Sequence, residues 1–191
     1  LDGTVKAISC WDNTDKKAYT FKKEDGLDID ALVNITDLFG SIDKEKAKNL
    51  GCEVLPGDAW IEQEVDILIP AALENQITSD NVGTIGSRVK VILEAANGPT
   101  TPDADEIIRN KSILLIPDFL ANAGGVTCSY FEQVQSNMNY YWEEDRVFEE
   151  LDKRMVSAYK AVRELAVVDK LYMRDAAYVI AVKRVVQAVK R

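Results

Sequence analysis

Three short and nearly continuous apolar runs stand out in the middle of the chain, at residues 65–72 (VDILIPAA), 89–96 (VKVILEAA) and 112–118 (SILLIPD). None of them alternates between apolar and polar positions, as a strand with one solvated face would. Residues 78–85 separate the first two runs. Residues 101–110 separate the last two and begin with a threonine, a proline and nearby acids, which favour a helix start. Buried strands separated by short helices predict an open parallel sheet covered on both faces, with right-handed crossovers.

The first sixty residues are less regular. Residues 5–10 (VKAISC) form a short apolar segment that predicts a strand, and residues 12–15 (DNTD) predict a turn because Asn and Asp bond to the nearby backbone. Asp28 precedes a stretch with helical character and is expected to be its N-cap. A turn over residues 55–58 (LPGD) and a short helical stretch from residue 59 are also predicted, while the pattern around them is ambiguous.

From Gly124 onward the chain has a helical pattern. Apolar residues recur at spacings of three and four, which places them on one face of a helix. The first series consists of Val147, Phe148, Leu151, Met155, Ala158, Val162 and Leu165. The second consists of Met173, Ala176, Ala177, Ile180, Ala181, Val185 and Ala188. Two C-terminal amphipathic helices are therefore expected to follow the α/β layer.

The composition supports one folded core and narrows the range of functions. Hydrophobic residues make up 47% of the 191 residues, enough for one domain with a helical appendage. The 23 basic and 32 acidic residues give a net charge of −9, so neither nucleic acid nor an anionic membrane is expected as a partner. No apolar run reaches the roughly 18 residues of a membrane helix, and no leader segment is recognised.

The chain contains no histidine and three scattered cysteines. Without histidine, Ser-His-Asp and Cys-His catalysis and His-ligated zinc are excluded, and no metal site is expected. Cys10, Cys52 and Cys128 are odd in number, which is typical of reduced thiols and predicts a cytoplasmic location. Each of them is most simply a packed thiol.

Small and amide residues gather where the predicted parallel strands end. Ala71 and Ala72 follow the first apolar run, Asn97 follows the second and Asn122 follows the third. Ligands of open parallel sheets bind at the carboxyl ends of the strands, and an asparagine amide suits a ribose hydroxyl or a carboxamide. Taken singly, an alanine pair at such a position more often packs a helix against the sheet than contacts a ligand, and an asparagine before a glycine more often belongs to a turn. Their recurrence at successive strand ends favours a site for a flat ligand.

Two glycines then open a helix. Gly124 and Gly125 precede the stretch that contains Ser129, about one turn into the helix. Free N–H groups and the helix dipole favour an anion such as a carboxylate at this end, and Ser129 adds a hydroxyl. On its own, a Gly-Gly pair is more often part of a turn.

Several longer strings carry a resemblance to a known family. They are residues 66–73 (DILIPAAL), 94–105 (EAANGPTTPDAD), 122–132 (NAGGVTCSYFE), 140–142 (YYW) and 173–178 (MRDAAY). In this order they closely resemble the hexameric glutamate dehydrogenases, over nearly the whole chain. The resemblance covers only that family's coenzyme-binding domain and C-terminal helices. The leucine, phenylalanine and valine dehydrogenases carry a different string at residues 97–101.

The resemblance implies a function and an architecture. The parent enzyme would convert L-glutamate to 2-oxoglutarate and ammonium with NAD or NADP, as a homo-hexamer. Residues 1–140 would form a Rossmann-like open parallel sheet that lacks its first strand and glycine-rich turn, and residues 141–191 would form helices packed on it. By analogy with the family, four residues would contact the coenzyme: Ala71, Ala72, Asn97 and Asn122. Val126 and Ser129 would line the substrate site, with Ser129 bonded to a glutamate carboxylate.

The chain also departs from the family. No G-x-G-x-x-G occurs in it, and Cys10 stands where many NAD-using relatives have an acid for the adenosine ribose. Asp12 lies two residues further on, and the choice between NAD and NADP stays open. The family's catalytic lysine and aspartate belong to an N-terminal domain outside this sequence. No catalytic residue is therefore assigned here, and the chain alone is expected to be inactive.

Two alternatives remain from the sequence. The chain could be a truncated, non-catalytic paralogue that serves as a binding or regulatory module. It could also belong to an amino-acid dehydrogenase of another specificity, because the pocket residues that set specificity lie largely outside it.

Overall fold

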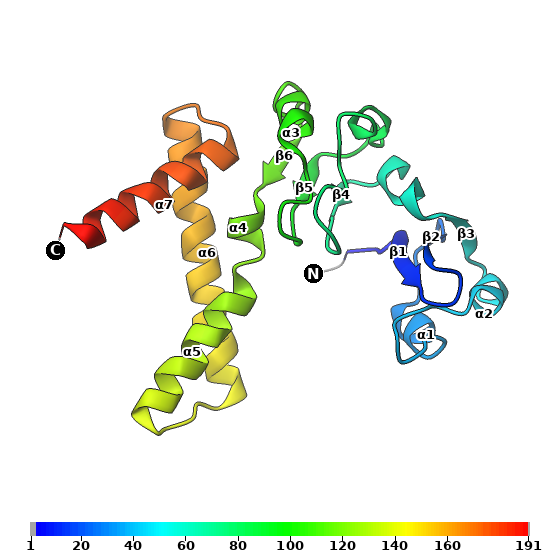
Figure 1. Cartoon of the computed structure of the whole chain (residues 1–191), viewed down its shortest axis with the longest axis horizontal. Helices are drawn as coiled ribbons and strands as arrows, with labels where there is room; N and C mark the ends of the chain where they lie inside the picture. The colour runs from blue at the N-terminus through cyan, green and yellow to red at the C-terminus, as the bar shows by residue number, and fades with distance from the viewer. Residues whose placement is uncertain (1–2, 191) are drawn as a thin grey trace. The chain divides into compact units, whose positions relative to one another are not determined.

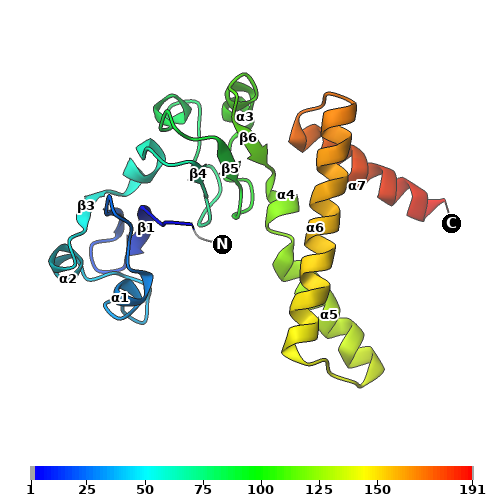
Figure 2. The ribbon, with the colours of Figure 1, turned by 180° about the vertical axis from the view of Figure 1, so that it is seen from behind.

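The computed structural model describes residues 3–190 and divides the chain into two compact units (Figures 1 and 2). Unit 1 comprises Leu1–Val65 and Thr84–Arg88, and unit 2 comprises Asp66–Gly83 and Val89–Arg191. Within the described residues, no helix has the length and apolar character needed to cross a membrane.

Unit 1 contains a three-stranded antiparallel sheet of order β1-β2-β3. β1 (Ala7–Asp12) and β2 (Lys17–Lys22) form a hairpin, and β3 (Glu53–Pro56) pairs with β2. The strand predicted over residues 5–10 is confirmed with a shift of two residues. Its pairing differs from the expected parallel sheet, because the adjoining turn returns the chain at once as an antiparallel partner.

The predicted turn after β1 is confirmed. The Asp12 carboxylate accepts hydrogen bonds of 2.8 Å from the backbone N–H groups of both Thr14 and Asp15. Lys16 then takes a positive φ of 54° before β2 begins. Local bonding of an aspartate to the following backbone is the reason the sequence predicted a turn here.

Two short helices lie between β2 and β3. α1 (Ile29–Val33) begins after Asp28, whose side chain accepts the Ala31 N–H at 3.0 Å, so the predicted N-cap is confirmed. α2 (Lys44–Asn49) is capped by Asp43 in the same way. These elements bury one apolar cluster, which contains Phe21, Leu27, Leu32, Ile42, Ala47 and Cys52.

A 3-10 helix, η1 (Gly57–Glu62), follows β3 directly and confirms the short helical stretch predicted from residue 59. The Gly57 carbonyl accepts hydrogen bonds from the hydroxyls of Ser9 and Thr20, at 2.8 and 3.1 Å. A Cβ atom at Gly57 would lie 2.4 Å from the Cβ of Ala18 and 2.8 Å from its carbonyl carbon. The turn predicted over residues 55–58 is thus the junction between β3 and η1, where the backbones approach closely.

Unit 2 contains the parallel sheet that the apolar runs predicted. β4 (Ile67–Leu68), β5 (Val91–Leu93) and β6 (Leu114–Ile116) pair in the order β4-β5-β6. Ile92 and Leu115, at the centres of β5 and β6, are fully buried. The sheet is not covered on both faces as predicted, because Ile67, Ile69 and Leu114 are 54%, 51% and 38% exposed. The absence of alternation indicated the strands but not the burial of both their faces.

The connections in this sheet are of two kinds. α3 (Pro102–Arg109) joins β5 to β6, and the Thr101 hydroxyl caps it by accepting the Ala104 N–H at 3.4 Å, as predicted. Between β4 and β5, by contrast, the only helical element is a single 3-10 turn, η2 (Val82–Thr84).

Four helices follow β6. They are α4 (Asp118–Ala121), α5 (Gly124–Met138), α6 (Glu144–Val168) and α7 (Met173–Val189), and the last two are the helices predicted from the periodic series. In α7 only the N-terminal part of that series packs, because Ala181, Val185 and Ala188 are exposed. α5 lies beside the N-terminal part of α6, and α7 turns back across the C-terminal part (Figures 1 and 2). Their shared core consists of Leu120, Val162, Ala166, Met173, Ala176 and Ala177. These helices form one compact unit with the parallel sheet.

The close approach at Gly57 gives a first prediction. Replacing Gly57 with Ala should lower the free energy of unfolding by about 1–3 kcal/mol, because the added methyl group collides with the Ala18 backbone. Urea unfolding measures the change. Gly3→Ala is the matched control, since a Cβ there has no atom within 4 Å. Equal stability of the two variants would contradict this account of the junction.

Candidate functional site

The carboxyl ends of β4, β5 and β6 lie at one edge of the parallel sheet and are joined by hydrogen bonds. The Pro70 carbonyl, after β4, accepts the N–H groups of Ala95 and Ala96, both at 3.0 Å. The Glu94 N–H, after β5, donates to the Ile116 carbonyl at 3.1 Å. The segments that follow the three strands are therefore held side by side, as the sequence predicted for a binding edge.

Ala71 and Ala72 are exposed in the segment after β4. Their small side chains leave the backbone at this strand end accessible from solvent. A flat ligand needs such access to approach the sheet edge.

Asn97 and Asn122 come together although 25 residues separate them. The amide Nδ2 of Asn122 donates to Oδ1 of Asn97 at 2.7 Å. Asn97 is exposed and Asn122 is half-buried. Among residues 3–190, Nδ2 of Asn97 and Oδ1 of Asn122 make no further hydrogen bond, which leaves an NH2 group as donor and a carbonyl oxygen as acceptor for a ligand.

Val126 and Ser129 lie on the first turns of α5. Both are exposed, Val126 by 70%, and a spacing of three places them on the same face of the helix. α5 begins at Gly124 after Ala123, with no side-chain cap on its first N–H groups. The N-terminal end of this helix thus offers backbone donors and a hydroxyl on one face.

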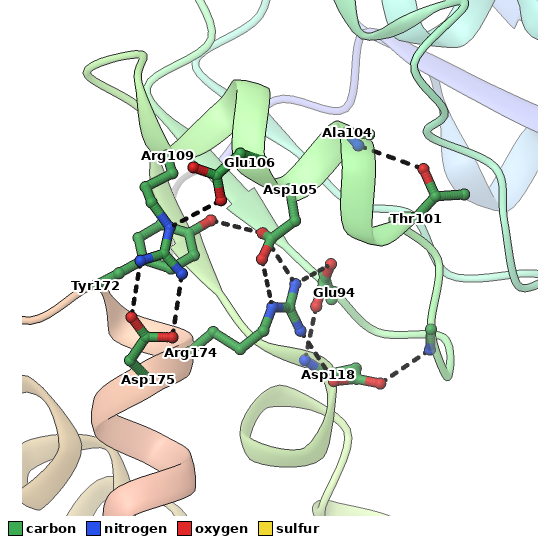
Figure 3. A network of polar contacts seen from close by, with 11 residues as sticks. Glu94, Thr101, Ala104, Asp105, Glu106, Arg109, Asp118, Tyr172, Arg174 and Asp175 are labelled. Carbon is green, nitrogen blue, oxygen red and sulfur yellow. Dashed lines mark hydrogen bonds and ion pairs between the residues drawn. The ribbon is translucent and has the colours of Figure 1, made fainter.

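A buried ionic cluster lies beside the turn that follows β5 (Figure 3). Arg174, the second residue of α7, reaches three carboxylates from three other segments. Its guanidinium bonds to Glu94 at 2.8 Å, to Asp105 at 3.0 Å and to Asp118 at 3.4 Å. The Glu94 side chain is 0% exposed and that of Arg174 is 16% exposed. We call these four residues the Arg174 cluster.

Asp118 connects the Arg174 cluster to the two asparagines. Its Oδ2 accepts the backbone N–H of Gly98 at 2.9 Å, and its carbonyl accepts the Asn122 N–H at 2.8 Å. Its own N–H donates to Oε2 of Glu94 at 2.9 Å. Gly98 has a positive φ of 51°, a conformation that glycine adopts without steric cost. The turn after β5 and the start of α4 are therefore fixed by one aspartate.

Two further contacts surround the cluster. The Tyr172 hydroxyl donates to Asp105 at 2.7 Å, and burial together with this hydrogen bond raises the pKa of Tyr172, which keeps it protonated. Burial opposes the charge on Arg174, but hydrogen bonds to Glu94 and Asp105 outweigh it and raise the pKa of Arg174 above the ordinary arginine value. The guanidinium is therefore permanently charged.

Sequence reasoning assigned no role to Arg174, Glu94, Asp105 or Asp118. One feature of the sequence did point to a buried ionic contact. Arg174 stands between Met173 and the two alanines of an otherwise apolar helix face, and a charged residue there needs buried partners. Nothing local in the sequence identifies those partners.

Comparison with known proteins identifies the family. The family model described as glutamate/leucine/phenylalanine/valine dehydrogenase matches residues 6–191. The chain belongs to this dehydrogenase family. The resemblance recognised in the sequence is thus confirmed.

Similar proteins include the NAD-specific glutamate dehydrogenase of Staphylococcus aureus, 46% identical over 165 residues, which cover 86% of this chain and 38% of that protein. The glutamate dehydrogenase structure from Peptoniphilus asaccharolyticus is 36% identical, with a TM-score of 0.75, over 98% of this chain and 40% of that one. The structure of the hetero-hexameric glutamate dehydrogenase from Thermus thermophilus is 25% identical, with a TM-score of 0.75, and the match covers 86% of this chain and 37% of that one. The chain therefore spans about 38% of the length of the curated relative.

In unit 1 of this dehydrogenase chain, Asp12 is engaged by its neighbours. Besides the N–H groups of Thr14 and Asp15, its carboxylate accepts a hydrogen bond from Nζ of Lys44, which holds the pKa of Asp12 below its usual range. Cys10 is half-buried, and burial raises the pKa of its thiol. Asp12 thus serves the β1–β2 turn, and its internal bonds occupy the carboxylate that a ribose hydroxyl would need.

The Arg174 cluster gives the second prediction. Glu94→Gln should lower the free energy of unfolding by about 3–5 kcal/mol, because the two oxygens of Glu94 accept from Arg174 and from the Asp118 N–H, and a glutamine turns an N–H group toward one of these buried donors. Chemical denaturation of the chain measures the loss. Glu106→Gln is the control, because the Glu106 side chain is 71% exposed and its Oε2 lies 3.8 Å from Nε of Arg109, a weak surface pair. A loss of about 0–1 kcal/mol in the free energy of unfolding is expected there. A loss at Glu94 no larger than at Glu106 would show that the buried pair is not stabilising.

Proposed function

We propose that this chain is the coenzyme-binding part, with the C-terminal helices, of an NAD-dependent glutamate dehydrogenase. The parent enzyme converts L-glutamate, NAD⁺ and water to 2-oxoglutarate, ammonium, NADH and a proton. The observation that carries the proposal is the hydrogen-bonded Asn97–Asn122 pair at the carboxyl ends of three parallel strands. The similarity to NAD-specific glutamate dehydrogenases supports the choice of substrate and coenzyme.

The exposed groups at the sheet edge fit the nicotinamide end of the coenzyme. NAD⁺, when bound, accepts a hydride from the α-carbon of glutamate. Ala71 and Ala72 leave the sheet edge open beside the ring and ribose. Nδ2 of Asn97 and Oδ1 of Asn122 offer the donor and acceptor that a ribose hydroxyl and a carboxamide require. In this proposal the chain binds and orients the nicotinamide at the edge formed by β4, β5 and β6.

The start of α5 is the proposed substrate side of the site. The Ser129 hydroxyl and the first backbone N–H groups of α5 hold a carboxylate of glutamate, and Val126 lines the pocket beside them. The helix dipole favours the same negative charge. By the family resemblance, proton transfer falls to a lysine and an aspartate outside these 191 residues.

NAD is the proposed coenzyme, with NADP as the alternative. The staphylococcal relative is NAD-specific, which supports NAD. The carboxylate of Asp12 is already bonded, and Cys10 offers a neutral thiol, so neither supplies the usual ribose-binding acid. The adenosine end therefore depends on other groups of the enzyme.

The proposal extends to assembly, location and domain division. We propose a hexameric parent, in line with the Thermus hetero-hexamer, and a cytoplasmic location for a chain whose three cysteines are all unpaired. Residues 1–140 are the proposed coenzyme-binding domain, and residues 141–191 are the helices packed on it.

The activity is tested on the whole protein that carries this chain. Glutamate-dependent formation of NADH, followed by absorbance, should be seen with NAD⁺, and 2-oxoglutarate with ammonium should reverse it. Leucine, phenylalanine and valine are the competing substrates, because the family includes dehydrogenases for each of them. Faster turnover with one of these, or none with glutamate, would overturn the proposal. The 191 residues alone are expected to give no turnover.

The role of Ser129 has its own test. Ser129→Ala should raise the KM for glutamate about tenfold or more, because a hydrogen bond to a charged carboxylate is lost, and should change the KM for NAD⁺ little. Ser136→Ala is the matched control, since Ser136 is an exposed serine further along α5. Equal KM values for glutamate in both variants would remove Ser129 from the substrate site.

A further inference from the structure

We propose that Arg174 is a positioning residue for the coenzyme site, which it acts on through Asp118. The proposal rests on the function proposed above and concerns a residue outside the groups that touch the coenzyme there. Arg174 lies on α7, remote in sequence from Asn97 and Asn122, and among residues 3–190 its side-chain hydrogen bonds go to Glu94, Asp105 and Asp118 instead. Its effect is exerted on the backbone segments that carry both asparagines.

Arg174 bonds to the segments that follow β5 and β6. Its guanidinium bonds to Glu94, the residue after β5, and to Asp118, which begins α4 after β6. Asp105 on α3 holds the guanidinium from a third side at 3.0 Å. The planar fork of an arginine can serve three carboxylates at once, whereas a lysine is a single point charge. The cluster therefore requires arginine in particular.

Asp118 in turn bonds to the backbone beside the two asparagines. One carboxylate oxygen of Asp118 faces Arg174, and the other accepts the N–H of Gly98, the residue after Asn97. The carbonyl of Asp118 accepts the N–H of Asn122. Asp118 therefore fixes the backbone beside both members of the amide pair. A turn of its carboxylate away from Arg174 would release Gly98 and alter the geometry of the Asn97–Asn122 hydrogen bond.

The neighbouring pair Arg109–Asp175 provides the contrast. It also joins α3 to α7, through two hydrogen bonds of 2.8 and 3.1 Å, and Arg109 stacks over the Tyr172 ring. The Arg109 side chain is 37% exposed, and its partners lie on α3 and α7, not on the turn after β5. Loss of Arg109 loosens the same pair of helices without touching the turn that carries Asn97.

The experiment compares three variants in the whole enzyme. Asp118→Asn cuts the link at the turn and leaves Arg174 paired with the buried Glu94. Arg174→Lys keeps the charge but loses the fork, and Arg109→Gln is the control. NADH binding is measured by fluorescence titration, the KM for NAD⁺ and glutamate by turnover, and stability by thermal unfolding.

Asp118→Asn and Arg174→Lys should each raise the dissociation constant of NADH and the KM for NAD⁺ about tenfold, while the KM for glutamate stays within about twofold. Arg109→Gln should lower the melting temperature yet leave NADH binding within about twofold of wild type. A rise in the KM for NAD⁺ without a rise in the KM for glutamate indicates a positioning role for the cluster. A general loss of stability would instead change NADH binding to a similar degree in all three variants.

Failure of the proposed function and failure of the positioning role give different results. If the wild-type enzyme binds no NADH, the proposed function falls and this inference falls with it. If the wild type binds NADH and Asp118→Asn and Arg174→Lys bind it as tightly, only the positioning role is overturned. Weakened NADH binding in Arg109→Gln to the same degree would also overturn it, because the effect would then follow helix docking alone.

Discussion

The buried charge of Arg174 is the constraint on which the C-terminal unit depends. One cation faces three carboxylates, so the cluster carries an excess of negative charge in a place nearly closed to water. Three neutral donors offset that excess, one for each acid. The Asp118 N–H bonds to Glu94, the Gly98 N–H to Asp118 and the Tyr172 hydroxyl to Asp105. Because each donor belongs to a different segment, satisfying the charges also fixes where those segments lie.

The position of Arg174 at the start of α7 fits the same electrostatics. A cation at a helix N-terminus is unfavourable, because the helix dipole is positive there. The three carboxylates that bond to the guanidinium offset this cost. Asp175, in the first turn of α7, adds a further favourable charge and binds Arg109. The docking of α7 against α3 and the sheet is thus an ionic contact at its start and an apolar one at Met173, Ala176 and Ala177.

The sequence predicted those parts of the fold that local rules determine. Runs without alternation predicted β4, β5 and β6, the periodic series predicted α6 and α7, and the caps Asp28 and Thr101 marked two helix starts. The antiparallel pairing of β1 was missed, because it is set by the turn at residues 12–15, which brings β2 back beside β1. The Arg174 cluster was missed because the hydrogen bonds of Arg174 join it to residues 56 to 80 positions away, and no local pattern in the sequence indicates such contacts.

The candidate site shows the same division between local and long-range information. Asn97 and Asn122 were each picked out by their place after a strand, but their hydrogen bond depends on how the two strand ends meet. That meeting is set by Asp118, whose backbone and side chain bond to the segments of both asparagines, and Asp118 is itself held by Arg174. The groups proposed to face the coenzyme are therefore two ordinary amides, one exposed and one half-buried, whose geometry depends on the buried charges that hold their backbone segments. A site of this kind is only as well placed as its buried support, so its chemistry cannot be separated from the packing of α7.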